Sequence, residues 1–346
     1  MTPVSPPGPA PSSTNVRSPH CSPSTCRAAS SDSRQAKASP LASLSASSSG
    51  ASGAPRNGDP VELILWAGSV KAFSLEQRIA AARAGGFSAS SLFPYDLAAA
   101  ADRGHGPESV RELFEQHGLR VAVVDPLTGW LPGSPVPSGL APDDPAFGGI
   151  EADEMFALAV ALGAGLVTLL ALYDDRVDPV EGARCFAALC DRAAERDLRL
   201  ALEFIPGTGI ADLATAMEIV RRADRANGGL MLDSWHFFRA GADFAGLKTI
   251  PPDALFAIQL SDAPAIPAAD LAHESLHERM IPGEGGLDLG AFLRATLAGG
   301  RPPLIGPEVF SDRTAEIPPQ WLGRLLGEST RTLMAASDGP PGVGAE

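Results

Sequence analysis

Four oxygen-bearing side chains stand at the ends of short apolar runs in the second half of the chain. They are Glu203, Asp233, Gln259 and Glu308. If these runs are parallel strands, their carboxyl ends meet on one face, where barrel active sites are built. Three carboxylates in a partly desolvated mouth would repel one another, and a bound cation is the simplest way to keep them ionised. The pattern therefore predicts a site for one divalent metal ion.

The ligand types indicate which metal to expect. Four oxygens, three of them charged, suit a hard ion such as Mn²⁺ or Mg²⁺ better than zinc, with Co²⁺ also open. Such a site leaves coordination positions for two neighbouring substrate oxygens. A single acidic residue at a strand end more often caps a helix or faces solvent, but four in register favour the metal site.

The elements that must position these residues alternate regularly. Apolar runs predict eight strands, at residues 61–66, 87–93, 120–124, 166–171, 199–203, 229–232, 254–259 and 303–305. Amphipathic stretches predict helices between them, at residues 75–84, 108–117, 151–162, 179–196, 211–226, 289–297 and 319–336. This alternation is typical of parallel strands joined by helical crossovers, and eight units predict an α/β fold, the closed (β/α)₈ TIM barrel. The turn after the first strand reads AGSV and lacks a glycine-rich fingerprint, so we expect no nucleotide cofactor.

Composition divides the chain into three parts. Residues 1–58 are rich in Ser, Pro, Ala and Gly and lack apolar periodicity, which predicts a disordered tail. A wrongly assigned start codon or a plain extension accounts for this tail better than a transit peptide does. Residues 59–337 are close to the roughly 250 of a TIM barrel. Residues 338–346 are expected to be a frayed C-terminus.

Charge and composition exclude several partners. The chain carries −14, and the tail is net +4, so the remainder carries −18. A body this acidic repels phosphate backbones, which argues against nucleic acid. No apolar run reaches the ~18 residues of a membrane span. The four cysteines form neither a disulfide framework nor a zinc motif, so we expect a cytoplasmic setting. Whether the chain forms a homo-oligomer stays open.

Several segments resemble the xylose isomerase-like TIM barrel superfamily over about residues 61–336. They are ALEFIP at 201–206, LDSWH at 232–236, IQLSDAP at 258–264, PGEG at 282–285 and GPE at 306–308. That superfamily includes sugar isomerases, keto-sugar 3-epimerases, inosose and 3-dehydroshikimate dehydratases, and AP endonucleases. The resemblance implies that the four residues above are its metal ligands. Where the epimerases commonly have His, this chain has Gln259, as some dehydroshikimate dehydratases do.

The resemblance also implies substrate contacts. The family's His three residues after the metal-binding Asp lies near the metal and contacts substrate, which indicates His236, whose ordinary pKa suits proton transfer. Arg279 offers a fork of donors, and the Ser275-x-x-x-Arg279 spacing is similar to a substrate-binding pair in dehydroshikimate dehydratases. Trp235, beside the metal motif, is a candidate pocket wall.

Together these features predict a metal-dependent isomerase or epimerase of a small polyhydroxylated substrate. The metal would stabilise an enediolate while Glu203, Glu308 and His236 move protons. A dehydratase of the 3-dehydroshikimate or inosose type shares the first half of this reaction and is the alternative. A non-catalytic sugar-binding barrel and an AP endonuclease are less favoured. The endonucleases need three metals, many histidines and a basic face.

Overall fold

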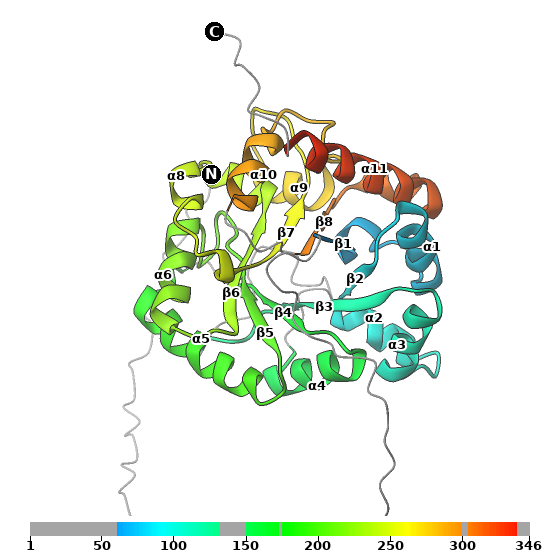
Figure 1. Ribbon diagram of the computed structural model, residues 1–346, viewed down its shortest axis with the longest axis horizontal. Coiled ribbons are helices and arrows are strands. Elements are labelled where there is room, and N and C mark those ends of the chain that lie inside the picture. Colours follow the sequence, from blue (N-terminus) through cyan, green and yellow to red (C-terminus); the bar gives the residue numbers. More distant parts are fainter. Residues whose placement is uncertain (1–60, 132–149, 173–174, 299–303, 338–346) are drawn as a thin grey trace, which may run out of the picture. The chain divides into compact units, whose positions relative to one another are not determined.

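Eight parallel strands close into a barrel in chain order, with β1 paired to β8 (Figure 1). This computed structural model describes residues 61–131, 150–172, 175–298 and 304–337. The strands are β1 (Glu62–Leu65), β2 (Ala89–Leu92), β3 (Arg120–Leu127), β4 (Leu166–Leu169), β5 (Arg199–Leu202), β6 (Gly228–Asp233), β7 (Leu255–Leu260) and β8 (Leu304–Pro307). The predicted TIM barrel is confirmed. The tail expected at 1–58 and the frayed end expected at 338–346 lie outside the described residues.

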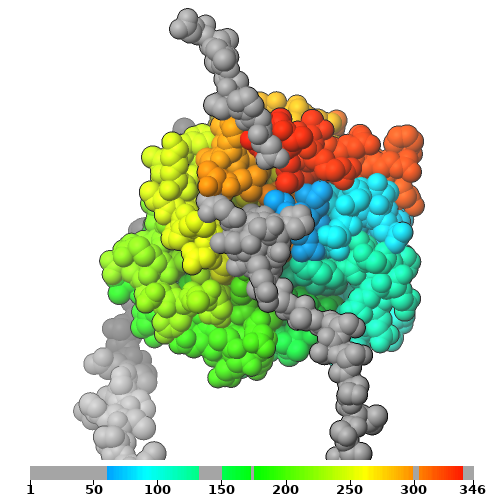
Figure 2. Space-filling view, viewed as in Figure 1, coloured from blue at the N-terminus to red at the C-terminus, as the bar shows by residue number. Residues whose placement is uncertain are grey.

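Helices surround the barrel, and their order around the rim follows the sequence (Figure 2). They are α1 (Leu75–Gly85), α2 (Pro94–Ala101), α3 (Pro107–Gln116), α4 (Ala152–Leu162), α5 (Pro179–Ala194), α6 (Leu213–Ala223), α7 (Ser234–Arg239), α8 (Phe244–Leu247), α9 (Leu271–His277), α10 (Leu289–Leu297) and α11 (Pro319–Ser337). The first and last helices, α1 and α11, pack against each other and so complete the ring. Across the described parts of the chain, no helix is long and apolar enough to cross a membrane.

Helix starts follow local chemistry. Ser74 begins α1 with a capping box, since its side chain accepts from the Gln77 N–H and the Gln77 side chain accepts from the Ser74 N–H. Asp212 caps α6 by accepting from the Thr215 N–H, so that helix begins at Leu213 and not at the expected residue 211. The short helices α2, α7, α8 and α9 were not expected, because four to eight residues give too little periodicity to recognise.

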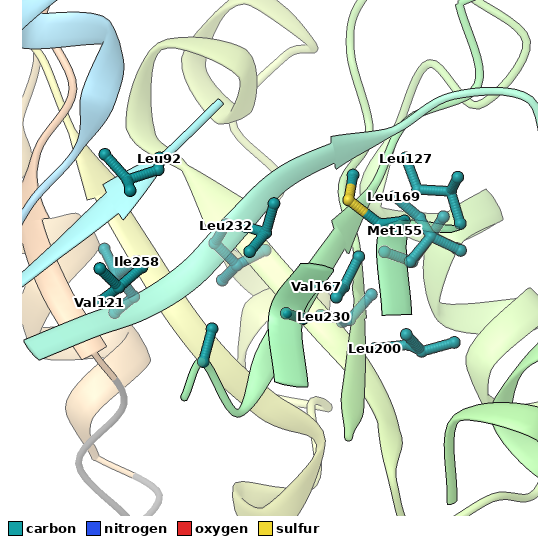
Figure 3. Packing of buried hydrophobic residues seen from close by; sticks show 14 of the residues in the cluster. Leu92, Val121, Leu127, Met155, Val167, Leu169, Leu200, Leu230, Leu232 and Ile258 are labelled. Carbon is teal, nitrogen blue, oxygen red and sulfur yellow. The ribbon is translucent and has the colours of Figure 1, made fainter. Parts of the chain in front are cut away.

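Strand side chains alternate between two apolar layers. One layer lies between the barrel and the helices, and Figure 3 shows part of it, with Leu200, Leu230, Leu232 and Ile258 from β5, β6 and β7. Residues of the opposite parity form a second cluster inside the barrel, among them Ala201, Met231 and Ala257. The next residues of this inner parity are Glu203, Asp233 and Gln259. The two-residue repeat of a strand thus directs the predicted ligands inward.

The approach of β8 to β1 depends on a glycine. A Cβ at Gly306 would lie 1.6 Å from the backbone oxygen of Ile64, so no side chain fits without moving a strand. Gly306 pairs with Gln259 in the sheet and stands two residues before Glu308. Close packing at this point therefore sets the position of the last predicted ligand.

We expect Gly306→Ala to destabilise the protein by about 1–3 kcal/mol, the usual cost of overpacking a core. The measurement is the free energy of unfolding in urea. Gly165→Ala is the matched control, because a Cβ there meets nothing within 4 Å. Equal stability of the two variants would show that β8 shifts without cost and would contradict this account.

Candidate metal centre

The four predicted ligands converge at the carboxyl ends of β5, β6, β7 and β8. Glu203 and Glu308 each continue the barrel by one bond, because their N–H groups donate to the Leu169 and Leu260 carbonyls. Asp233 pairs with Gln259 in the β6–β7 ladder. All four side chains are buried, with exposed fractions from 0% to 5%. The structure thus places the four residues at adjacent strand ends on one inner face, and their role as metal ligands stays a prediction.

Asp233 is held from two sides. Its Oδ1 accepts the His236 N–H at 2.9 Å, which makes Asp233 the N-cap of α7. Its Oδ2 accepts from Arg279 Nη1 at 2.8 Å. A carboxylate oxygen has two lone pairs, so each oxygen keeps one for a metal ion. The cap and the ion pair together fix the orientation of this ligand.

His236 lies against the same cluster. Its Nε2 is 3.4 Å from Glu203 Oε1, and one donor atom each from Glu203, Asp233 and His236 lie within 4.8 Å of one another. Burial lowers the pKa of His236 to about 3, opposed in part by the charge of Asp233. The ring is therefore neutral at physiological pH, unlike the near-neutral titration expected from the sequence. His236 is positioned to serve as a ligand as well as a substrate contact.

Unpaired polar atoms are concentrated at this centre. Gln259 Oε1 and Nε2, Glu308 Oε1 and His236 Nδ1 are buried without a hydrogen-bond partner in the described structure. Leaving a buried polar atom unsatisfied costs about 1–3 kcal/mol. Oxygen atoms at Gln259 and Glu308 that lack a hydrogen are suited to bind a cation instead. The residues present therefore fit a divalent metal ion.

The pKa values of the buried carboxyl groups also favour a bound cation. Burial, and then the charges of Asp233, Asp125 and Glu308, raise the pKa of Glu203 well above its ordinary value. Burial, and then Asp125, raise the pKa of Glu308 in the same way, against the opposing charge of Arg279. A cation supplies the missing positive charge, so binding it must displace protons from these two carboxyl groups.

Glu203 and Glu308 of the cluster line an open pocket with about 500 Å³ of space, open solvent included. Apolar side chains make most of its wall: Phe93, Pro126, Leu170, Leu172, Ile205, Leu276 and Phe310. The polar lining consists of Asp125, Glu203, His236, Ser275, Arg279 and Glu308. An apolar wall with a few converging polar groups is the composition of a small-molecule site.

The expected pair Ser275 and Arg279 is brought together at the end of α9. Arg279 Nη2 donates to Ser275 Oγ at 3.0 Å, and its Nε donates to the Ser275 carbonyl at 2.8 Å. Since Nη1 binds Asp233, the guanidinium group links α9 to the cluster of predicted ligands. Nη2 also lies 3.4 Å from His236 Nε2, so one of the five N–H groups is left to reach a substrate oxygen.

Trp235 does not line the pocket, although the sequence predicts that it forms part of the pocket wall. Its Nε1 donates to Glu274 Oε1 at 2.8 Å. Glu274 also forms a buried ion pair with Arg239 at 2.6 Å. The indole lies beside the His236 ring, with the centroids 5.3 Å apart. Trp235 therefore supports His236 from behind, and its predicted contact with substrate stays a prediction.

Sequence reasoning missed Asp125, a further carboxylate in the pocket. It lies in β3 and accepts a hydrogen bond from Thr168 Oγ1 in β4. Burial, and then the charge of Asp233, raise its pKa to about 6, against the hydrogen bond from Thr168. Asp125 directly follows the apolar run RVAVV, which is the signal that could have found it.

Comparison with known proteins gives the family. The model for xylose isomerase-like TIM barrels matches residues 79–328, more than half of the chain. The chain belongs to this family. Its relatives by sequence include proteins named as 3-dehydroshikimate dehydratase and inosose isomerase.

Two curated relatives illustrate this range. The 3-dehydroshikimate dehydratase of Pseudomonas aeruginosa is 31% identical over 242 residues, which are 69% of this chain and 36% of that protein. The inosose isomerase of Bacillus subtilis is 33% identical over 124 residues, 35% of this chain and 44% of that protein. The chain thus matches less than half the length of either relative.

Solved structures agree with the fold. A crystal structure of the IOLI protein with a bound zinc atom superposes with a TM-score of 0.68 at 20% identity, over 79% of this chain and 98% of that one. A fusion of a xylose isomerase-like barrel with a 4-hydroxyphenylpyruvate dioxygenase gives a TM-score of 0.67 at 24% identity, over 82% and 46%.

We expect Mn²⁺ or Mg²⁺ to raise the melting temperature more at pH 8 than at pH 5. Carboxyl groups whose pKa is raised by folding favour the metal-free fold at low pH, and this contribution is lost as pH rises and they ionise. Metal binding removes that penalty, so its stabilising effect should grow with pH. Differential scanning calorimetry with and without metal measures the effect.

Glu308→Gln removes one of the protons involved and should flatten this pH dependence. Glu218→Gln, at an exposed helical ion pair, is the matched control and should leave it intact. A metal-induced shift of the same size at both pH values would contradict the assigned ligand set.

Proposed function

We propose that the chain is a divalent-metal-dependent enzyme that forms an enediolate from a small hydroxy-ketone and then expels water from it. The observation that carries this proposal is the buried cluster of Glu203, Asp233, Gln259 and Glu308. Gln259 and Glu308 have unpaired oxygens, and Glu203 and Glu308 line a pocket. Mn²⁺ or Mg²⁺ held there would act as a Lewis acid that stabilises the negative charge of the enediolate.

The chain's own residues perform the proton transfers. Glu203, ionised when the metal is bound, lines the pocket and can act as the base for an α-proton of the substrate. The neutral His236, whose Nε2 is 3.4 Å from Glu203 Oε1, also lines the pocket and can contact a substrate hydroxyl group. Arg279 brings a permanent positive charge to the pocket, which favours the enediolate over the neutral ketone. Glu308 is the second buried carboxyl group and can return a proton.

The pocket wall supports a cyclic substrate. Open-chain sugars carry a hydroxyl group on nearly every carbon and need many polar partners. Here a few polar groups converge, but most of the wall is apolar, including Phe93, Leu170 and Phe310. A ring with oxygens along one edge matches this distribution, because the edge reaches the polar groups and the ring faces pack on the wall. 3-Dehydroshikimate, whose ketone and hydroxyl oxygens lie on three adjacent ring carbons, has this form, whereas an inosose carries an oxygen on every ring carbon.

Dehydration is favoured over isomerisation by two observations. Gln259 stands where the epimerases commonly have His, and the match to 3-dehydroshikimate dehydratases extends over 242 and 246 residues. Isomerisation or epimerisation, the first expectation from the sequence, is the second candidate. The inosose isomerases of three Bacillus species support it, with matches of 124 to 185 residues.

The test is incubation of the metal-loaded protein in D₂O with 3-dehydroshikimate, an inosose and a panel of keto-sugars. We expect deuterium at the α-carbon and loss of water for a cyclic substrate. Glu203→Gln should slow both by about 10²–10⁴-fold, the range of general base catalysis. Glu218→Gln is the remote control. Absence of exchange with every compound would contradict enediolate chemistry and favour a non-catalytic sugar-binding barrel.

A further inference from the structure

One carboxylate of the pocket, Asp125, has no role in the proton transfers assigned to Glu203, Glu308 and His236. Asp125 lines the same pocket as Glu203 and Glu308 and is only 5% exposed. It belongs to β3, which is four strands away from β7 in the closed order of eight (Figure 1). Asp125 therefore reaches the pocket from the half of the barrel, β1 to β4, that carries none of the four predicted ligands, and a substrate in the pocket would lie beside both Asp125 and Glu203.

The orientation of Asp125 is fixed by its neighbour. Thr168 Oγ1, fully buried on β4, donates a hydrogen bond to Asp125 Oδ1. Because Oδ1 accepts this hydrogen, a proton on the carboxyl group belongs on Oδ2. Burial, and then the charge of Asp233, raise the pKa of Asp125 to about 6, against the hydrogen bond from Thr168. The side chain is thus arranged as a proton donor within the pocket.

A dehydration needs such a donor, and isomerisation does not. When the carbon–oxygen bond of the β-hydroxyl group breaks, the oxygen leaves with the electron pair and must gain a proton, because hydroxide is a poor leaving group. Under the proposed function, Glu203 and the metal act at the ketone and its neighbouring hydroxyl group. A further donor on a strand without a ligand would complete the site for this second step.

We propose that Asp125 is the acid that protonates the departing hydroxyl group and that Thr168 positions it. Glu203 takes the α-proton, and the carbon–hydrogen electron pair becomes the enediolate double bond. As the enediolate collapses, a new carbon–carbon double bond forms and the β carbon–oxygen bond breaks. The Asp125 proton joins the leaving oxygen, so one water is released and no oxidant or reductant is required. This role rests on the proposed function.

Asp125→Asn separates this role from a structural one, since Asn keeps the shape and an oxygen that can accept from Thr168. With 3-dehydroshikimate and Mn²⁺ in D₂O, we expect α-deuterium exchange within about threefold of wild type and water loss slower by about 10²–10⁴-fold. Thr168→Val should show the same separation with a smaller loss, while Thr168→Ser, which keeps the hydroxyl group, should stay near wild type.

The outcomes distinguish the two proposals. Equal slowing of exchange and water loss in Asp125→Asn, or no slowing of either, would overturn the acid role while wild-type activity upholds the proposed function. Wild-type protein that neither exchanges nor dehydrates would contradict the proposed function and the acid role with it. If Asp125→Asn unfolds below the assay temperature, the Thr168 variants provide the test. Slower water loss with unchanged α-deuterium exchange in Thr168→Val, but not in Thr168→Ser, supports the acid role, and any other result overturns it.

Discussion

Repulsion among buried carboxylates is the constraint on which the whole site depends. Four acidic side chains, Asp125, Glu203, Asp233 and Glu308, are nearly excluded from water at one end of the barrel. Arg279 is the one arginine or lysine that lines their pocket in the described structure, and it binds Asp233 directly. One positive charge does not balance four carboxylates. The raised pKa values of Glu203 and Glu308 and the unpaired oxygens of Gln259 and Glu308 all express this deficit.

The fold tolerates the shortage of positive charge around these carboxylates because the acids belong to rigid elements. Strand alternation directs Glu203, Asp233 and Gln259 inward, while the residues beside them pack outward under the helices. Asp233 is further fixed as the N-cap of α7, which also sets the place of His236. A site built on strand ends keeps its geometry when charges change, which suits the proposed binding of a cation.

The sequence predicts the barrel and the ligands because both follow from local patterns. Glu203, Asp233, Gln259 and Glu308 each follow an apolar run, and parallel strands bring such positions together. Contacts made across the fold leave no such pattern. The Arg279–Asp233 ion pair joins residues 46 positions apart, and only the three-dimensional arrangement reveals that Trp235 supports His236 and binds Glu274.

Asp125 was missed for a different reason. It is a single acid in the first half of the chain, and β3 continues past it to Leu127, so it does not mark a strand end as the other acids do. Its proposed role and the choice of dehydration over isomerisation both presuppose a metal at the four-ligand centre. The most direct test of that centre is equilibrium dialysis against Mn²⁺ with metal measured by mass spectrometry. We expect one ion per chain in wild type and a clear loss of affinity in Gln259→Leu, which keeps the volume but lacks the oxygen. Absence of bound metal in wild type, or unchanged affinity in Gln259→Leu, would contradict the account.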